Sequence, residues 1–470
     1  MTLVACSTAA PPYAPEASIT APTAYAGDLP PSGVDDNWWR GFDDPVLTEL
    51  VTDGLEANLD IAIARDRLRS AAALLRAERA DRLPSIDGVA DVDIGIGTFD
   101  TDAARLGLIG AFDPDISGRL AAEIRAAAAD YAQAEYILAD QRRLVAAAIA
   151  GQYIEYRRTG AQLDLLEQST ELQEQTLRIV RLRFEAGLAA NLDVRRAAAD
   201  LEQTRARRGL IAIARAGAAN RLAVLLGRSP GIYEPAVSVT ERTIPDYSGG
   251  PSAGTPADLL RRRADILVAE AGLLRAAAIV GVEQSDLRPS LTIPASVTLG
   301  DGSIAGVFDE FIATIGAALD LPLFDGGRRR AEIAAAEADA DARFDEYRLA
   351  FLNALGEVEN ALVAIEANQQ RIEALRGAIE QSETALGQST ALFREGLATL
   401  FDVLDAQRQL IASQQSLIDS EAALAASFVA FNAAVGSQVV EVIEETSPGT
   451  RSDSAVIEDR HDRNSSAPVR

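Results

Sequence analysis

Two pairs of short segments along the chain alternate apolar with polar residues. The first pair covers residues 90–97 and 106–112, and the second pair covers residues 291–299 and 315–321. A period of two predicts β-strands with one apolar and one polar face. We therefore expect one strand hairpin at about residues 86–114 and another at about residues 290–322.

The environment of this predicted sheet has two interpretations. On the strands alone, a half-buried sheet in a soluble protein is the simpler one. However, the polar face of the first hairpin carries Asp87, Asp91 and Asp93, and each run approaches the ~9–11 residues of an outer-membrane strand. Four strands cannot close a barrel, and lipid does not tolerate an open sheet edge. If these strands face lipid, several chains must pool them, and three copies would supply about twelve.

A long stretch without proline follows each predicted strand hairpin. No Pro occurs between Pro114 and Pro230 or between Pro322 and Pro448, and a Pro inside a helix costs about 3 kcal/mol. We expect helical hairpins at residues 119–227 and 328–436. Their first arms would each reach about 100 Å at the usual rise per residue.

Apolar residues in these first arms recur every seven positions, which predicts coiled-coil packing. They are Leu165, Leu172 and Ile179 in the first arm, and Ile365, Ile372, Ile379, Leu386 and Phe393 in the second.

The ends of the two arms repeat each other at an offset of 209 residues (396 − 187). The matching residues are Gly187 and Gly396, Leu188 and Leu397, and Asp193 and Asp402. Glycine reaches positive φ without steric cost, so each of the two glycines is expected to end a helix at a hairpin turn.

The composition narrows the classes of function. The formal net charge is −26 and every basic residue is Arg, so the chain is a poor partner for nucleic acid. His461 and Cys6 are the single His and the single Cys, which essentially excludes disulfides, zinc clusters and His-based triads. No glycine-rich phosphate loop follows a strand, and no run of about 18 apolar residues predicts a transmembrane helix. We expect no enzymatic activity, no metal and no cofactor.

The N-terminus has two interpretations. Leu3-Val4-Ala5-Cys6 is similar to the end of a bacterial lipoprotein signal, in which the Cys is lipidated. A working signal needs a charged region and about 7–15 apolar residues, and only Met1-Thr2 precede this stretch. Either the true start lies upstream, which we favour, or Cys6 is an ordinary free thiol. Residues 7–32 are rich in Pro, Ala and Ser and predict an extended tether.

These patterns divide the chain into five segments. They are an N-terminal tether at 1–36, a first repeat at 37–231, an inter-repeat segment at 232–257, a second repeat at 258–436 and a polar, disordered tail at 437–470. The expected fold class is mostly α with a small β part, because each repeat joins a strand hairpin to a long helical hairpin.

Several motifs occur in an order that is typical of one family. They include "NWWRGFDDPVLTELVTDGLEANLDIAIA" (37–64), "RLPSI" (82–86), "NRLAVLLGRSPG" (220–231), "LRPSL" (287–291), "LPLFDGGRRR" (321–330) and "FREGLATLFDVLDAQR" (393–408). Through them the chain resembles the outer-membrane efflux proteins of the TolC type, most closely the lipoprotein branch with OprM and NodT-like channels. The resemblance covers roughly residues 37–436, and each motif is weak when taken singly.

The resemblance implies a homotrimer with a twelve-stranded β-barrel in the outer membrane and a long α-helical barrel across the periplasm. It implies a passive exit duct for drugs or other small molecules. The implied partners are a periplasmic adaptor (membrane fusion) protein, an inner-membrane pump of the resistance-nodulation-division type and outer-membrane lipid. Lipidation of Cys6 would add an anchor.

The resemblance also implies roles for residues at the hairpin tips. Leu188 and Leu397, beside Gly187 and Gly396, match adaptor-docking contacts; the alternative is a plain helix-hairpin turn. Asp402 and Asp405, which lie three residues apart in the second half, match a pair of carboxylates in the family. In the family that pair faces inward and forms acidic rings at the pore constriction. Such rings would raise some pKa values through like-charge repulsion. Without the resemblance, these two residues would be interpreted as solvated surface acids.

The closed gate of the family implies a further set of residues. It uses a Tyr and an Arg of the second hairpin that bond to an acceptor at the position of Asp193. Here Phe393 and Ala398 occupy those two positions, so the network cannot form in that way. We therefore expect closure to rest on hydrophobic packing and on the acidic rings, and the channel to open more easily.

Two alternatives to an efflux duct remain open. The same architecture could serve type I protein secretion or metal-ion efflux. A soluble coiled-coil scaffold belongs to a different class, and the apolar face of the predicted strands argues against it.

Overall fold

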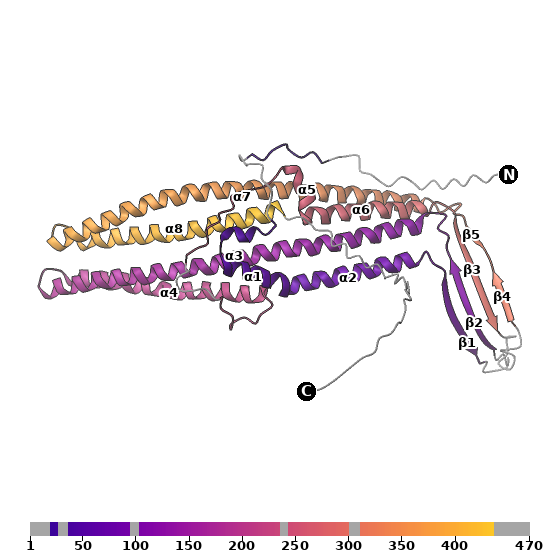
Figure 1. Cartoon of the computed structure of the whole chain (residues 1–470), viewed down its shortest axis with the longest axis horizontal. Helices are drawn as coiled ribbons and strands as arrows, with labels where there is room; N and C mark the ends of the chain where they lie inside the picture. The colour runs from indigo at the N-terminus through magenta and orange to yellow at the C-terminus, as the bar shows by residue number, and fades with distance from the viewer. Residues whose placement is uncertain (1–18, 27–35, 95–102, 236–242, 300–310, 437–470) are drawn as a thin grey trace, which may run out of the picture. The chain divides into compact units, whose positions relative to one another are not determined.

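The computed structural model describes residues 19–26, 36–94, 103–235, 243–299 and 311–436. The chain divides into a unit Met1–Val439 and a C-terminal unit Val440–Arg470. The tail expected at 437–470 lies outside the described residues. Helices dominate the described part of the chain, whose strands form one small sheet (Figure 1). The expected fold class, mostly α with a small β part, is confirmed.

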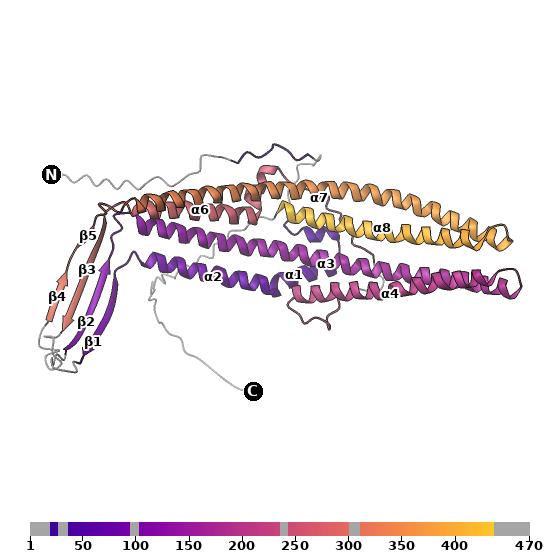
Figure 2. The same cartoon turned by 180° about the vertical axis from the view of Figure 1, so that it is seen from behind.

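The chain runs through the same kinds of element twice. The first half contains η1 (Trp38–Phe42), α1 (Pro45–Ala57), α2 (Leu59–Ala80), β1 (Ser85–Asp93), β2 (Ala103–Phe112), α3 (Arg119–Glu185) and α4 (Asn191–Leu225). The second half contains η3 (Pro256–Asp258), α5 (Leu259–Arg262), α6 (Ala264–Ser285), β3 (Ser290–Leu299), β4 (Phe311–Ile315), β5 (Ala318–Asp320), α7 (Arg328–Glu395) and α8 (Leu400–Val435). Helix α3 packs along α4, and α7 packs along α8, so each half ends in a helical hairpin (Figures 1 and 2).

A carboxylate ahead of each long helix fixes where that helix begins. Asp115 accepts hydrogen bonds from the N–H groups of Leu120 (2.9 Å) and Ala121 (2.8 Å) in the first turn of α3. Asp325 accepts one from the N–H of Arg329 (3.1 Å) in the first turn of α7. These N–H groups have no partner inside a helix, and an anion is favoured at the positive end of the helix dipole.

The buried seam of α7 follows the expected seven-residue spacing, whereas that of α3 is displaced by one residue. The α7 seam consists of the buried Ile365, Ile372, Leu386 and Phe393 and the partly buried Ile379. In α3 the expected Leu165, Leu172 and Ile179 are partly buried, and Leu166, Gln173 and Val180 are buried instead. Leu172 and Ile179, like Ile379 of α7, pack against the apolar cluster near the tips, so the expected residues border the buried stripe of α3. Helix α3 packs on both α4 and α8, and its Val180 belongs to one apolar cluster with Leu201 of α4 and Leu404 of α8.

The largest apolar core lies where elements of both halves meet. Its fully buried members include Leu47 of α1, Tyr153 of α3, Phe351 of α7 and Phe431 of α8. The inter-repeat segment contributes Tyr247, whose ring centroid lies 4.9 Å from that of Phe42 and 4.7 Å from that of Phe428. Burying one such side chain stabilises a fold by about 1.5–3 kcal/mol, so this core holds the two repeats together.

Two buried arginines connect elements that are distant in the sequence. Arg157 of α3 donates to the carboxylate of Asp44, ahead of α1, at 2.7 Å. Arg263, ahead of α6, donates to Glu357 of α7 (2.6 Å) and to the carbonyl of Ala434 in α8 (2.9 Å). Both members of the Arg157–Asp44 pair are buried, so removing one of them would cost about 3–5 kcal/mol.

Helix α8 is an apolar helix of this core. Among the described helices it alone is long and apolar enough to cross a membrane by composition, but 61% of its most apolar stretch is buried in the protein. Small polar residues interrupt that stretch. The hydroxyls of Ser420 and Ser427 donate to the carbonyls of Ser416 and Ala423 one turn earlier, both at 2.7 Å, so both donors are satisfied within α8. The hydroxyl oxygen of Ser427 also accepts a hydrogen bond from Nδ2 of Asn368 in α7 at 3.4 Å.

The sheet has the antiparallel order β1-β2-β3-β4, and β5 also pairs with β3. The sequence predicts a single strand in place of β4 and β5. Both keep one register along β3, with Ile315 opposite Ala295 and Ala318 opposite Thr292. Between them, the N–H of Gly316 donates to the carbonyl of Pro294 at 2.9 Å. Pro294 has no N–H to return, so the ladder is interrupted there.

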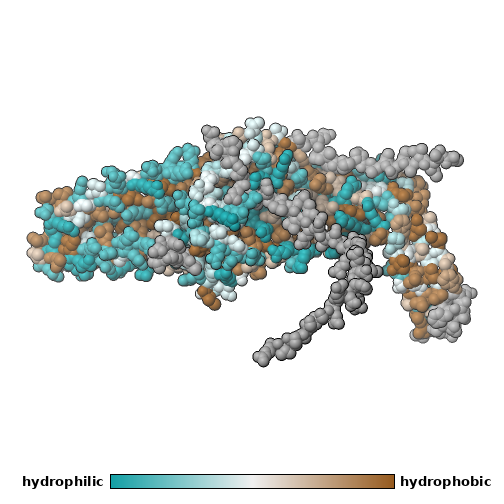
Figure 3. Space-filling view, in the orientation of Figure 1, coloured by the Kyte–Doolittle hydropathy of each residue, from teal (hydrophilic) through white to brown (hydrophobic). Residues whose placement is uncertain are grey.

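The sheet separates apolar from polar side chains, because residues directly opposite each other share a face. One face carries Leu106, Leu108, Val297, Leu299 and Phe311 in paired positions. The other face carries Asp87, Asp91, Arg105, Ser296 and Thr314. Figure 3 shows the hydrophobic residues gathered over the strands.

The apolar face of the sheet is uncovered within one chain. Leu108 is 53% exposed and Phe311 is 67% exposed. No described helix packs on the sheet, and the edge strands β1 and β4 each have one described neighbour. The half-buried sheet of a soluble protein is therefore not what a single chain forms.

Candidate functional site at the hairpin tips

The two hairpin turns have the same backbone construction. Gly187 has φ +72° and Gly396 has φ +79°, both in the left-handed region. The N–H of Leu188 donates to the carbonyl of Arg183 (2.7 Å), and the N–H of Leu397 donates to that of Leu392 (2.8 Å). These bonds satisfy carbonyls at the ends of α3 and α7, as in a Schellman motif. Both glycines are thus required by the turn itself.

Each tip exposes apolar side chains at repeated positions. Leu188 is 68% exposed and Leu397 is 75% exposed. The next repeated pair, Leu192 and Phe401, is 57% and 58% exposed. Sequence reasoning missed this second pair, although it has the same offset of 209 residues (401 − 192). Each tip therefore presents two apolar side chains that its own chain leaves uncovered.

The tips differ in how their second helix begins. Thr399 is the N-cap of α8: its hydroxyl and its N–H both donate to Oδ2 of Asp402, at 2.7 Å and 2.8 Å. This is a capping box, and its Thr-x-x-Asp spacing is visible in the sequence. The equivalent N-cap of α4 is Ala190, which makes no side-chain cap. Asp193, the counterpart of Asp402, is partly buried on α4.

The acidic residues of α8 lie in different environments. Hydrogen bonds from the Thr399 side chain and backbone lower the pKa of Asp402, so this carboxylate stays ionised. Asp405 is exposed and lies 3.9 Å from the guanidinium of Arg408. Arg408 also lies 4.0 Å from Asp200 of α4. A positive charge that sequence reasoning overlooked therefore accompanies Asp405.

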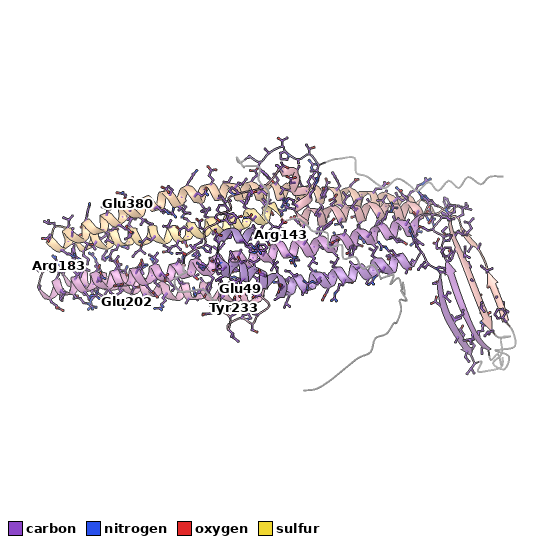
Figure 4. All side chains as sticks on the ribbon, viewed as in Figure 1. Glu49, Arg143, Arg183, Glu202, Tyr233 and Glu380 are labelled. Carbon is purple, nitrogen blue, oxygen red and sulfur yellow. The ribbon has the colours of Figure 1, made fainter. Side chains whose placement is uncertain are left out.

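Phe393 is buried and does not line a surface in one chain. It belongs to an apolar cluster near the tips that joins all four hairpin helices, with members such as Val180, Leu201, Leu386 and Leu404. The guanidinium of Arg183 lies 4.8 Å from the centroid of its ring. Figure 4 shows Arg183 near the end of the helical hairpins. Nothing in the repeat pattern pointed to Arg183, because the equivalent residue in α7 is Leu392.

Comparison with known proteins identifies the family. A family model described as "Outer membrane efflux protein" matches residues 50–228 and 255–437. The chain belongs to this family. Each matched segment spans strands of the sheet and a helical hairpin, so an outer membrane efflux protein of this kind carries its characteristic unit twice.

Relatives of this outer membrane efflux protein point the same way. The chain is 31% identical over 346 residues to "Nodulation protein T" of Rhizobium leguminosarum bv. viciae. This match covers 72% of this chain and 70% of that protein. It is 29% identical over 345 residues to "Toluene efflux pump outer membrane protein TtgF" of Pseudomonas putida, covering 70% of each chain.

A solved structure of the outer-membrane channel OprN is also similar. It has 30% sequence identity and a TM-score of 0.82, and the match covers 92% of this chain and 100% of that chain. The fold is therefore that of a TolC-type channel. The protein is an outer-membrane efflux duct, located in the outer membrane and extending into the periplasm.

One expected site of this duct lies outside the described residues. Cys6, the candidate lipidation site, falls in residues 1–18, which the structure does not describe. The remaining expected residues all lie at the tips, although their roles in docking and in pore constriction depend on partners and on other copies of the chain.

Proposed function

We propose that three copies of this chain assemble into one passive exit duct. Their sheets together form a twelve-stranded barrel in the outer membrane, and their helical hairpins form a tunnel across the periplasm. Small molecules enter the tunnel from a periplasmic adaptor and an inner-membrane pump of the resistance-nodulation-division type. The duct itself supplies no energy.

The sheet is the observation that supports this proposal. It has two open edges, and one apolar face that no described element covers. In lipid every backbone polar group must be paired, so a sheet with open edges is stable only when other strands close it. Further copies of the same sheet can provide these strands while the apolar face contacts lipid.

The hairpin tips support the proposed partners. Three chains present six tips with closely similar backbones and paired apolar side chains, and a ring of adaptor hairpins fits such a repeated surface. Toluene, in the name of one relative, is a small apolar molecule, and small molecules are the cargo that we propose here. Lipidation of Cys6 would add a membrane anchor on the periplasmic side.

Planar-bilayer recordings test this function directly. The full-length protein is purified in detergent, and its mass is measured by native mass spectrometry before reconstitution. We expect a particle of three copies and step-like channel conductance that needs no nucleotide and no ion gradient of its own. A single-copy particle, or three copies without conductance under any applied voltage, would refute the proposal.

A further inference from the structure

Arg183 makes a direct contact between the two hairpin tips of one chain. Its Nη1 donates to the carbonyl of Phe393 (2.9 Å) and to the carbonyl of Arg394 (3.1 Å). Both carbonyls belong to the last turn of α7, and Arg183 itself lies in the last turn of α3. The contact therefore links the end of one hairpin arm to the end of the other.

Three features favour this contact energetically. The last carbonyls of a helix lack partners inside the helix, and the helix dipole places negative charge there. The guanidinium also lies 4.8 Å from the centroid of the Phe393 ring, an attractive cation–π geometry. Against these gains, Nε of Arg183 is buried without a hydrogen-bond partner, which costs part of the stabilisation.

The second hairpin has no equivalent residue that could donate from the end of α7 to the end of α3. Adding the repeat offset of 209 residues to Arg183 gives Leu392, which cannot donate (183 + 209 = 392). Further from the tips, the two hairpins also share a bond from Nε2 of Gln407 to the hydroxyl of Thr176 (2.7 Å). That bond joins neutral groups, so Arg183 provides the charged link closest to the turns.

We propose that Arg183 is a latch that holds the two hairpin tips together and keeps the periplasmic end of the duct closed. The gating part of this inference rests on the proposed function, whereas the link between the tips does not. Opening requires the hairpins to move apart, which breaks both carbonyl bonds and withdraws the guanidinium from the Phe393 ring. The latch thereby supplies closure at a tip where Phe393 and Ala398 cannot bond as the family's gate residues do.

Recordings on an Arg183→Ala variant test the latch. Losing a charged hydrogen bond of this kind should raise the ratio of open to closed time roughly tenfold. Arg183→Lys keeps one charged donor but loses the flat guanidinium face, so its increase should be smaller. Arg181→Ala is the matched control, because Arg181 is an exposed residue on the same helix. Equal gating in Arg183→Ala and Arg181→Ala would overturn the proposal.

A distance measurement separates the latch from the channel function. Spin labels are placed at Glu185→Cys and Glu395→Cys, at the exposed ends of α3 and α7, in a Cys6→Ser background. Arg183→Ala should lengthen and broaden the label distances, and Arg181→Ala should leave them unchanged. If the wild type does not conduct, the proposed function fails while this measurement still decides whether Arg183 joins the tips. Unchanged distances in Arg183→Ala would show that no latch exists.

Discussion

Thr399 distinguishes the second hairpin tip from the first. Its hydroxyl and N–H hold Asp402, whereas Ala190 in the first tip leaves the equivalent Asp193 without a cap. Repetition in the sequence predicted the shared glycines and leucines but treated the two carboxylates as equivalent. The difference follows from one hydroxyl, because Ala cannot accept a hydrogen bond through its side chain.

Substitutions at the two equivalent N-cap positions, 399 and 190, should have opposite effects on the stability of the helix that each one begins. Thr399→Ala removes the capping box and should destabilise the first turn of α8 by about 1 kcal/mol. Ala190→Thr should create a capping box with Asp193 and stabilise the first turn of α4 by a similar amount. Hydrogen exchange of the amides in these two turns measures both changes. If the first-turn amides of α8 exchanged no faster in Thr399→Ala than in the wild type, the assigned cap would be wrong.

The turn glycines allow a second prediction at the residue scale. Gly187→Ala should destabilise the first tip by about 1–2 kcal/mol, because an L-residue resists the left-handed conformation. A Cβ at Gly187 would meet no atom within 4 Å, so the cost is conformational and not steric. Gly151→Ala is the control: Gly151 lies inside α3 with equally free space, and Ala should stabilise it by up to about 1 kcal/mol.

Thermal unfolding of the purified proteins compares the two glycine variants. Gly187→Ala should have a lower midpoint than the wild type, and Gly151→Ala an equal or higher one. If both variants shifted the unfolding midpoint in the same direction, the left-handed conformation of Gly187 would not explain the effect of Gly187→Ala.

At the scale of elements, the sequence predicted the helices better than the sheet. The helical hairpins expected at 119–227 and 328–436 compare with helices α3 and α4, which span 119–225, and with α7 and α8, which span 328–435. Proline positions and turn glycines act on the backbone locally, so they predict where a helix begins and ends without knowledge of its neighbours. The interruption of β4 and β5 depends on Pro294 in the neighbouring strand, and the displaced seam of α3 depends on its second helical neighbour. Neither can be seen in one segment alone.

The two faces of β3 allow a matched test of lipid contact. Val297→Arg places a charge on the apolar face, and Ser296→Arg places the same charge on the polar face one residue away. A lipid-facing Arg costs about 2–4 kcal/mol near the middle of a bilayer. We therefore expect less Val297→Arg protein in the outer-membrane fraction and near-normal amounts of Ser296→Arg. Equal amounts of both variants would argue that the apolar face does not meet lipid.

At the scale of the whole molecule, repetition is what connects sequence to function. Two copies of one unit in each chain, and three chains in the proposed duct, give a periodic ring of tips from a single gene. The family and the membrane location could be predicted from ordered motifs. The link made by Arg183 could not, because it joins residues 210 positions apart whose contact depends on how the two hairpins meet.

The exposed leucines at the tips should be needed for efflux by the system assembled with its adaptor, but not for folding or conductance of the isolated protein. A Leu188→Asp, Leu397→Asp double variant places charges where apolar contact with an adaptor is proposed, so it should fail to restore resistance to toxic compounds in a deletion strain. Its amount in the outer membrane and its conductance should stay normal. Gln369→Asp, an exposed change elsewhere on α7, serves as control. Full resistance with the double variant would exclude these leucines from docking.

The serines buried in α8 have a consequence for how the protein leaves the cytoplasm. A polypeptide bound for the outer membrane must first be threaded through the inner one, where a long apolar stretch halts and is released sideways into the bilayer. Helix α8 approaches that limit by length and composition. Hydroxyls such as those of Ser420 and Ser427 add polarity during passage and then bond to their own helix after folding. Exchanging them for alanine would cost the finished core little beyond the bond that Asn368 donates to Ser427, but it would favour arrest during secretion.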